Sequence, residues 1–83
     1  MDKELYAGMT PELEQYFEAY FDLFNTQGWK QFMEDMEGNQ ESLNTVMTIK
    51  DANDFYIRKG KLEALNMILN FKTYIENSYK DAL

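Results

Sequence analysis

The sequence contains neither cysteine nor histidine in its 83 residues. Without cysteine the chain cannot form disulfides, zinc–thiolate sites or a thiol nucleophile, and this absence fits a reducing compartment. Without histidine it lacks the usual general base near neutral pH and the commonest transition-metal ligand. We therefore expect a non-enzymatic protein with no catalytic residues, no cofactor and no metal site.

Long hydrophobic runs are also missing. No apolar stretch approaches the roughly 20 residues of a membrane-spanning helix, and the opening MDKELYAG has no apolar segment like that of a signal peptide. We expect no membrane association, and a place in the cytosol or in an assembly formed there. A chain this short hides only about 60 to 65% of its unfolded surface, so its stability is expected to be marginal unless chains associate.

Positive charge is scarce in the first half of the chain. Residues 1–41 carry ten acidic side chains against Lys3 and Lys30, whereas residues 42–83 carry five acidic and six basic side chains, so the net charge of −7 divides into −8 and +1. Nucleic-acid binding depends on neutralising phosphates with cations. The composition therefore disfavours a nucleic-acid partner and favours a basic protein surface.

Three acidic residues, Glu14, Glu18 and Asp22, are spaced one helical turn apart in this half. Like charges at this spacing repel one another by a few tenths of a kcal/mol per pair. A solvated helix face is the simpler interpretation. The functional alternative is a contact for a basic protein partner.

The pattern of apolar residues predicts an all-α protein of three helices, at about residues 11–25, 28–50 and 52–80, in a single domain 1–83. Thr10 and Pro11 form a typical helix start, and Asp51 is a second N-cap with Asp54 three residues later. The apolar phase continues across Gly38, which predicts one uninterrupted second helix.

The short connection near Lys50 predicts that the second and third helices form an antiparallel hairpin after a short aromatic and acidic first helix. In that register Leu43 lies near Gly60 or Leu62, and Met36 lies near Leu65 or Leu69. Fusion of the two helices into one rod is the alternative that the Asp51 cap disfavours. The third helix is apolar over most of its circumference, so it needs neighbours on more than one side, and we expect homo-oligomers.

One stripe of the third helix contains a glycine, which costs about 1 kcal/mol relative to alanine inside a helix. The stripe comprises Ile57, Gly60, Ala64, Met67 and Phe71. The small pair Gly60 and Ala64 would let another helix or an aromatic side chain approach closely. Packing inside the chain, under an aromatic of the first helix, is the leading interpretation. A partner chain and a merely tolerated glycine are the alternatives.

Several residues together carry a resemblance to a known group of proteins: Gly28, Trp29, Asp51, Gly60, Leu62 and Leu65. Over residues 28–75 the chain resembles small uncharacterised helical-hairpin proteins of tailed bacteriophages. The resemblance implies a phage origin, a location in the host cytoplasm or the virion, and either an assembly role or a host-directed role. The proteins of this group have no established active site that the resemblance could assign to this chain.

Two functions are consistent with these observations. The first is a non-enzymatic phage accessory or structural protein that acts by protein–protein contact as a homo-oligomer. The second is an acidic phage-encoded inhibitor that binds a host enzyme such as RNA polymerase or a nuclease. A nucleic-acid-binding module using Arg58, Lys59 and Lys61 is disfavoured by the overall charge.

Overall fold

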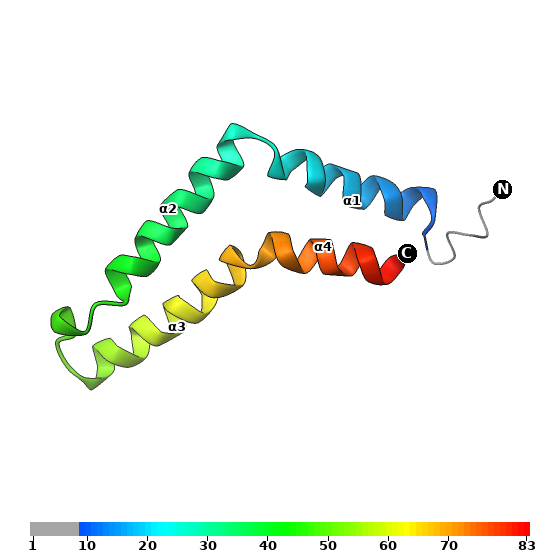
Figure 1. Ribbon diagram of the computed structural model, residues 1–83. Helices are drawn as coiled ribbons and strands as arrows, with labels where there is room; N and C mark the ends of the chain where they lie inside the picture. The colour runs from blue at the N-terminus through cyan, green and yellow to red at the C-terminus, as the bar shows by residue number, and fades with distance from the viewer. Residues whose placement is uncertain (1–8) are drawn as a thin grey trace.

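The computed structural model describes residues 9–83, and the regular structure in this range is helical (Figure 1). It comprises α1 (Pro11–Phe24), α2 (Gln27–Leu43), the short 3₁₀ helix η2 (Val46–Thr48), α3 (Ala52–Leu69) and α4 (Phe71–Ala82). The all-α prediction is confirmed, but the described residues form four α-helices rather than three. The expectation that the opening MDKELYAG is not a signal peptide concerns residues 1–8, which lie outside the described residues.

The helices form a bent ribbon that is two helices wide. Along its length α1 lies beside α4 and α2 lies beside α3, while α1 meets α2 and α3 meets α4 at the bend (Figure 1). α1 does not pack along α3, and α2 reaches α4 only at the bend, where the Trp29 and Phe71 ring centroids are 6.5 Å apart. The expected antiparallel hairpin is present as α2 and α3, and Leu43 and Leu62 line the same pocket between them. Each helix therefore has one neighbour along its length, and within residues 9–83 no second layer covers the ribbon.

The helix starts follow from local capping. The Thr10 Oγ1 accepts a hydrogen bond from the Leu13 backbone N–H at 3.1 Å, and the Asp51 Oδ1 accepts one from the Asp54 N–H at 2.7 Å. These bonds satisfy N–H groups that lack a partner in the first turn, as the sequence predicts. Thr26 caps α2 in the same way, so that helix begins at Gln27.

The prediction of one continuous helix over residues 52–80 is wrong, because the helix is interrupted at Asn70. The Asn70 side-chain Nδ2 donates to the Asn66 carbonyl oxygen at 2.8 Å, and Asn70 has φ −98° and ψ 4°. Asparagine side chains compete with the helical backbone in this way. The interruption divides the helix into α3, which pairs with α2, and α4, which pairs with α1.

The second helix also ends earlier than the predicted Lys50, at Leu43. Asn44 is its C-cap, and the Thr45 Oγ1 donates to the Glu41 carbonyl oxygen at 3.0 Å. The next residues, TVMTI, are rich in β-branched side chains, which lower helix propensity. They form η2 and the extended turn into α3.

The buried core is small and lies mainly between α1 and α4. Aromatic rings meet there edge to face: Phe17 and Tyr79 have centroids 5.3 Å apart, and Tyr20 and Phe71 are 5.2 Å apart. Such pairs contribute roughly 0.5–1.5 kcal/mol beyond their buried area. The buried residues are Met9, Phe17, Phe24, Leu65 and Ile75. Leu65 alone among them belongs to the α2/α3 hairpin, which is therefore thinly packed.

Ile75 tests this core, because it is 1% exposed and packs within the aromatic cluster. We expect Ile75→Ala to lower the free energy of unfolding by about 2–4 kcal/mol, since it leaves a cavity that the surroundings fill only partly. Urea unfolding followed by circular dichroism measures the change. The neighbouring exposed change Glu76→Ala should have little effect, and equal losses for both variants would contradict this description of the core.

Candidate protein interface

The two faces of the α2/α3 hairpin differ in polarity. On one face, the groove between the helices is lined by Gln40, Asn44, Lys59, Leu62, Glu63 and Asn66. On the other face, two grooves follow one another along the hairpin, the first lined by Asn39, Ser42, Leu43, Lys61, Ala64 and Leu65 and the second by Trp29, Phe32, Met67, Ile68 and Phe71. Residues three and four apart share one side of a helix. The α3 residues at this spacing before and after the two grooves therefore belong to the same second face.

We call this second side the apolar face. It comprises Phe32, Ile57, Gly60, Ala64, Met67, Ile68, Phe71 and Tyr74. Its large side chains remain in contact with solvent: Ile57 is 51% exposed, Met67 76% and Tyr74 64%. All five residues of the stripe predicted from the sequence belong to it, and four of them are exposed.

Phe71 is the half-buried member of the stripe. Its ring lies 5.2 Å from Tyr20 and 6.2 Å from Phe24, measured between centroids, so it also belongs to the aromatic core. The apolar face is therefore continuous with the core at the bend of the ribbon.

The leading sequence interpretation of Gly60, close packing inside the chain, is wrong. Gly60 is exposed, and a Cβ atom built on it meets no neighbouring atom within 4 Å. The reason is the bend of the ribbon, which places α1 against α4 rather than against α3. A contact with a partner chain and a tolerated glycine are the interpretations that stay open.

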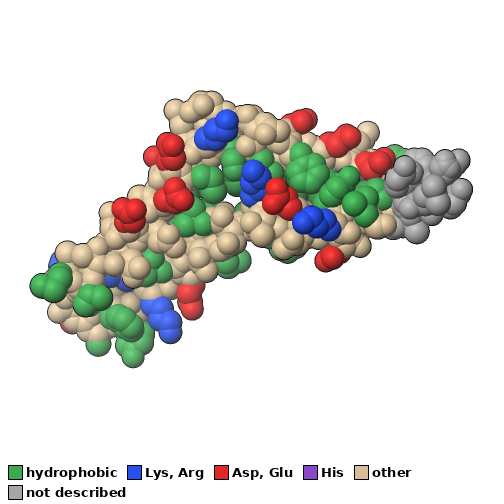
Figure 2. Space-filling model, viewed as in Figure 1, with side chains coloured by type: hydrophobic (Ala, Val, Ile, Leu, Met, Phe, Trp, Pro, Cys, Tyr) green, Lys and Arg blue, Asp and Glu red, His purple; other side chains and the backbone are tan. Residues whose placement is uncertain are grey.

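Figure 2 shows a different face of the molecule, on which acidic side chains lie along α1 and α2 and mixed charges lie on α4. Glu14, Glu18 and Asp22 are all exposed and follow one another along α1 at one-turn spacing. These three side chains therefore share one accessible side of α1, and we call them the acidic strip. Hydrophobic side chains also gather at the hairpin end in this view, where Val46 is 76% and Met47 is 92% exposed.

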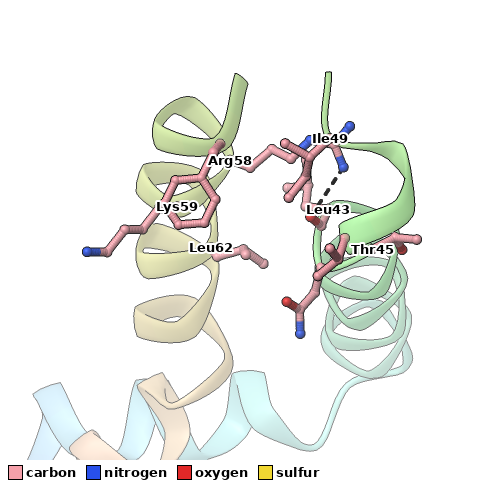
Figure 3. Close-up of a pocket in the computed structure, with 9 residues that line it drawn as sticks. Leu43, Thr45, Ile49, Arg58, Lys59 and Leu62 are labelled. Carbon is pink, nitrogen blue, oxygen red and sulfur yellow. Dashed lines mark hydrogen bonds between the residues drawn. The ribbon is translucent and has the colours of Figure 1, made fainter. Parts of the chain in front are cut away.

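A pocket of about 250 Å³ opens at this hairpin end (Figure 3). Its apolar wall is formed by Leu43, Val46, Ile49, Phe55 and Leu62, and its polar groups come from Asn44, Thr45, Arg58 and Lys59. The pocket lies where the end of α2, the turn containing η2 and the first turns of α3 meet.

Arg58 holds this turn together. Its guanidinium donates to the Thr48 Oγ1 at 2.8 Å, to the Thr48 carbonyl at 3.0 Å and to the Leu43 carbonyl at 3.4 Å, and its Nε is 3.2 Å from Asp54 Oδ1. A cation at the C-terminus of α2 satisfies a free carbonyl and complements the helix dipole. The sequence did not reveal this connection of Arg58 to α2.

The three basic residues that lie close together in the sequence of α3 do not form one patch on the surface. Arg58 is committed to the turn, Lys59 lines the polar groove, and Lys61 lines a groove on the apolar face. A nucleic-acid surface needs its cations together, so this arrangement gives no support to a nucleic-acid site.

Two further features concern residues 9–83 as a whole. This part of the chain contains no group of three or more acidic side chains placed to hold a metal ion. None of its helices combines the length and the hydropathy needed to cross a bilayer.

Comparison of the chain with protein-family models, curated proteins and solved structures finds no match. The bacteriophage resemblance over residues 28–75 consequently stays a prediction from the sequence.

The turn gives a prediction for the pH dependence of stability. The hydrogen bond from the Lys50 backbone N–H to Asp54, followed by the one from Arg58, lowers the pKa of the Asp54 carboxyl below its ordinary value. Because the folded pKa lies below the unfolded one, the contribution of Asp54 is fully present above the unfolded pKa and is lost as pH falls through the folded pKa.

We therefore expect Asp54→Asn to flatten the loss of unfolding free energy below about pH 5, measured by urea unfolding at a series of pH values. The control is Asp35→Asn, which removes a carboxyl from an exposed position on α2 and should keep the parent slope. If Asp54→Asn kept that slope as well, the proposed contribution of this carboxyl would be wrong.

Proposed function

We propose that the protein is non-enzymatic and acts by protein–protein contact, as a self-associating phage accessory or structural protein. The observation that carries the proposal is the exposed apolar face on a ribbon without a second layer. Lys61 is the charged residue on this side of α3, and the residues around it are apolar or small. Ile57, Met67 and Tyr74 are large, apolar and more than half exposed.

The size of this surface is sufficient for association. Four large apolar side chains of the apolar face, Phe32, Ile57, Met67 and Tyr74, are between 42% and 76% exposed. Taking about 150–250 Å² for each large side chain, they expose on the order of 450 Å². At about 25 cal/mol per Å² their burial contributes roughly 11 kcal/mol per chain, comparable to the estimated 4–15 kcal/mol cost of association. A partner must therefore cover most of the face.

The phage role is supported by the resemblance carried by Gly28, Trp29, Asp51, Gly60, Leu62 and Leu65. Trp29 lies at the bend of the ribbon beside Phe24, with centroids 4.9 Å apart, and Asp51 caps α3. Trp29 therefore contributes to the bend, and Asp51 contributes to the start of the second helix of the hairpin. A small self-associating helical protein of this kind suits an assembly role in the virion or an accessory role in the host cytoplasm.

The acidic strip on α1 supports a second candidate, an inhibitor that binds a basic surface of a host enzyme. Glu14, Glu18 and Asp22 are accessible together. RNA polymerases and nucleases carry such basic surfaces because they bind nucleic-acid phosphates. Neutralising the three residues with Glu14→Gln, Glu18→Gln and Asp22→Asn should abolish binding to such an enzyme and leave self-association intact. Unchanged enzyme binding would exclude this acidic strip as the contact.

Sedimentation equilibrium tests the leading proposal. We expect a molar mass that is a multiple of 9.9 kDa for the parent chain at micromolar concentration. Met67→Glu should shift the equilibrium toward the monomer, because a charge on the apolar face would be desolvated by association. Asn66→Glu adds the same charge in the polar groove and should keep the parent mass. A strictly monomeric parent chain would contradict self-association.

A further inference from the structure

We infer that the apolar face pairs with the same face of a second copy in a two-fold arrangement, with α3 lying antiparallel across α3 of the partner. Gly60 and Ala64 form the point of closest approach. This inference rests on the proposed function and specifies its partner and its geometry. Three independent features of the described residues lead to it: the spacing of the stripe, the polarity of α2 and the distribution of charge.

The spacing of the stripe is symmetric. Ile57, Gly60, Ala64 and Met67 follow one another at intervals of three, four and three residues, in the order large, small, small, large. In an antiparallel two-fold contact the same residues meet in reverse order. In an antiparallel pair centred between Gly60 and Ala64, each glycine faces the partner's alanine, and each Ile57 faces the partner's Met67.

The space needed for this contact is present. Beyond the adjacent backbone of α3, no atom of the described residues lies within 4 Å of a Cβ built at Gly60, and Ala64 is exposed. Packed helices lie 8–10 Å apart, depending on the side chains at the contact, and this pair of small residues allows an approach at the close end of that range. Ile57 and Met67 then pack against the partner on either side of Gly60 and Ala64.

The polarity of α2 selects which helices meet. On the apolar face, α2 presents Asn39 and Ser42 beside the α3 stripe. Stacking α3 on α2 of the partner would bury these polar side chains against apolar ones, which is costly without new hydrogen bonds. Stacking α3 on α3 matches apolar surface with apolar surface and encloses the faces of both hairpins in a four-helix arrangement.

The charge distribution selects the antiparallel orientation. Residues 44–62, at the hairpin end, carry four basic and two acidic side chains, a net charge of +2. The other described residues, 9–43 and 63–83, carry three basic and eleven acidic side chains, a net charge of −8. A parallel pair would place like ends together. An antiparallel pair places the basic hairpin end of one copy over the acidic part of the other, and complementary charge favours that orientation.

The area is also appropriate for a second copy of this chain. Stable dimers bury about 800 Å² per partner. The four large side chains supply on the order of 450 Å², and Gly60, Ala64, Ile68 and the aliphatic part of Lys61 lie between them on the same face. The acidic strip of α1 lies outside this surface, so it stays in solvent when the faces meet.

Single cysteines test the geometry directly, because the chain has none of its own. In the antiparallel pair, residue 57 of one copy faces residue 67 of the other. The two copies of residue 57 are therefore separated by about 15 Å along the helix axis, at 1.5 Å per residue, and the two copies of residue 67 are separated by the same distance. We therefore use Ile57→Cys and Met67→Cys with a bis-maleimide whose reach is close to the 8–10 Å helix spacing.

We expect each variant alone to give almost no covalent dimer, and an equimolar mixture, after exchange of subunits, to give the cross-linked heterodimer. Lys61→Cys keeps all the large apolar side chains of the face and lies next to the two-fold axis, so it should cross-link with its own copy and report the pairing even if the other variants associate more weakly. Asn66→Cys, in the polar groove, should give no product alone or mixed with Ile57→Cys.

Efficient cross-linking of Ile57→Cys alone and of Met67→Cys alone would show a parallel pair and overturn the inference. A multimeric parent that gives no product for Lys61→Cys would overturn this geometry while leaving self-association intact. A monomeric parent would overturn both. Circular dichroism of each variant shows whether the helices are retained, so that loss of folding is recognised separately.

Discussion

A ribbon two helices wide cannot enclose its own helices, and most of the structure depends on this constraint. Each helix has one neighbour along its length, which covers one side of it. α1 and α4 come closer to satisfying the constraint because most of their aromatic side chains concentrate between them, and Tyr16 and Tyr74 are the aromatic residues of this pair that stay more than half exposed. α3 does not satisfy it, since its apolar residues continue around the helix to Ile57 and Met67. The exposed apolar face is the part of α3 that a single neighbour leaves uncovered.

The bend and the hairpin turn then decide where this uncovered surface lies. Asn70 interrupts the helix and lets α4 join the aromatic cluster with α1, which leaves α3 with α2 alone. At the other end, the hydrogen bonds of Arg58 fix the turn around Thr48 and hold the hairpin closed. The apolar face therefore lies on a supported surface, and little ordering entropy is lost when a partner covers it.

Local signals in the sequence predicted local structure well. Thr10 and Asp51 cap helices because a side-chain oxygen and an N–H three residues later suffice, and the apolar period indicated which side of α3 Gly60 and Ala64 share. The interruption at Asn70 was missed because the apolar period continues through it, and only a side-chain hydrogen bond distinguishes it. The position of α1 was missed for a related reason: which helix covers which side depends on that bend, so the supposed neighbour of Gly60 is not there.

Two methionines of the same chain offer the most direct measurement of whether a partner covers the apolar face. In the isolated chain Met67 is 76% exposed on this face, and Met47 is 92% exposed at the hairpin end. Peroxide oxidises accessible methionine to its sulfoxide, and peptide mass spectrometry gives the rate at each position. We expect Met67 to oxidise much more slowly than Met47 at high protein concentration, and the two rates to converge on dilution. Equal rates at every concentration would contradict the account.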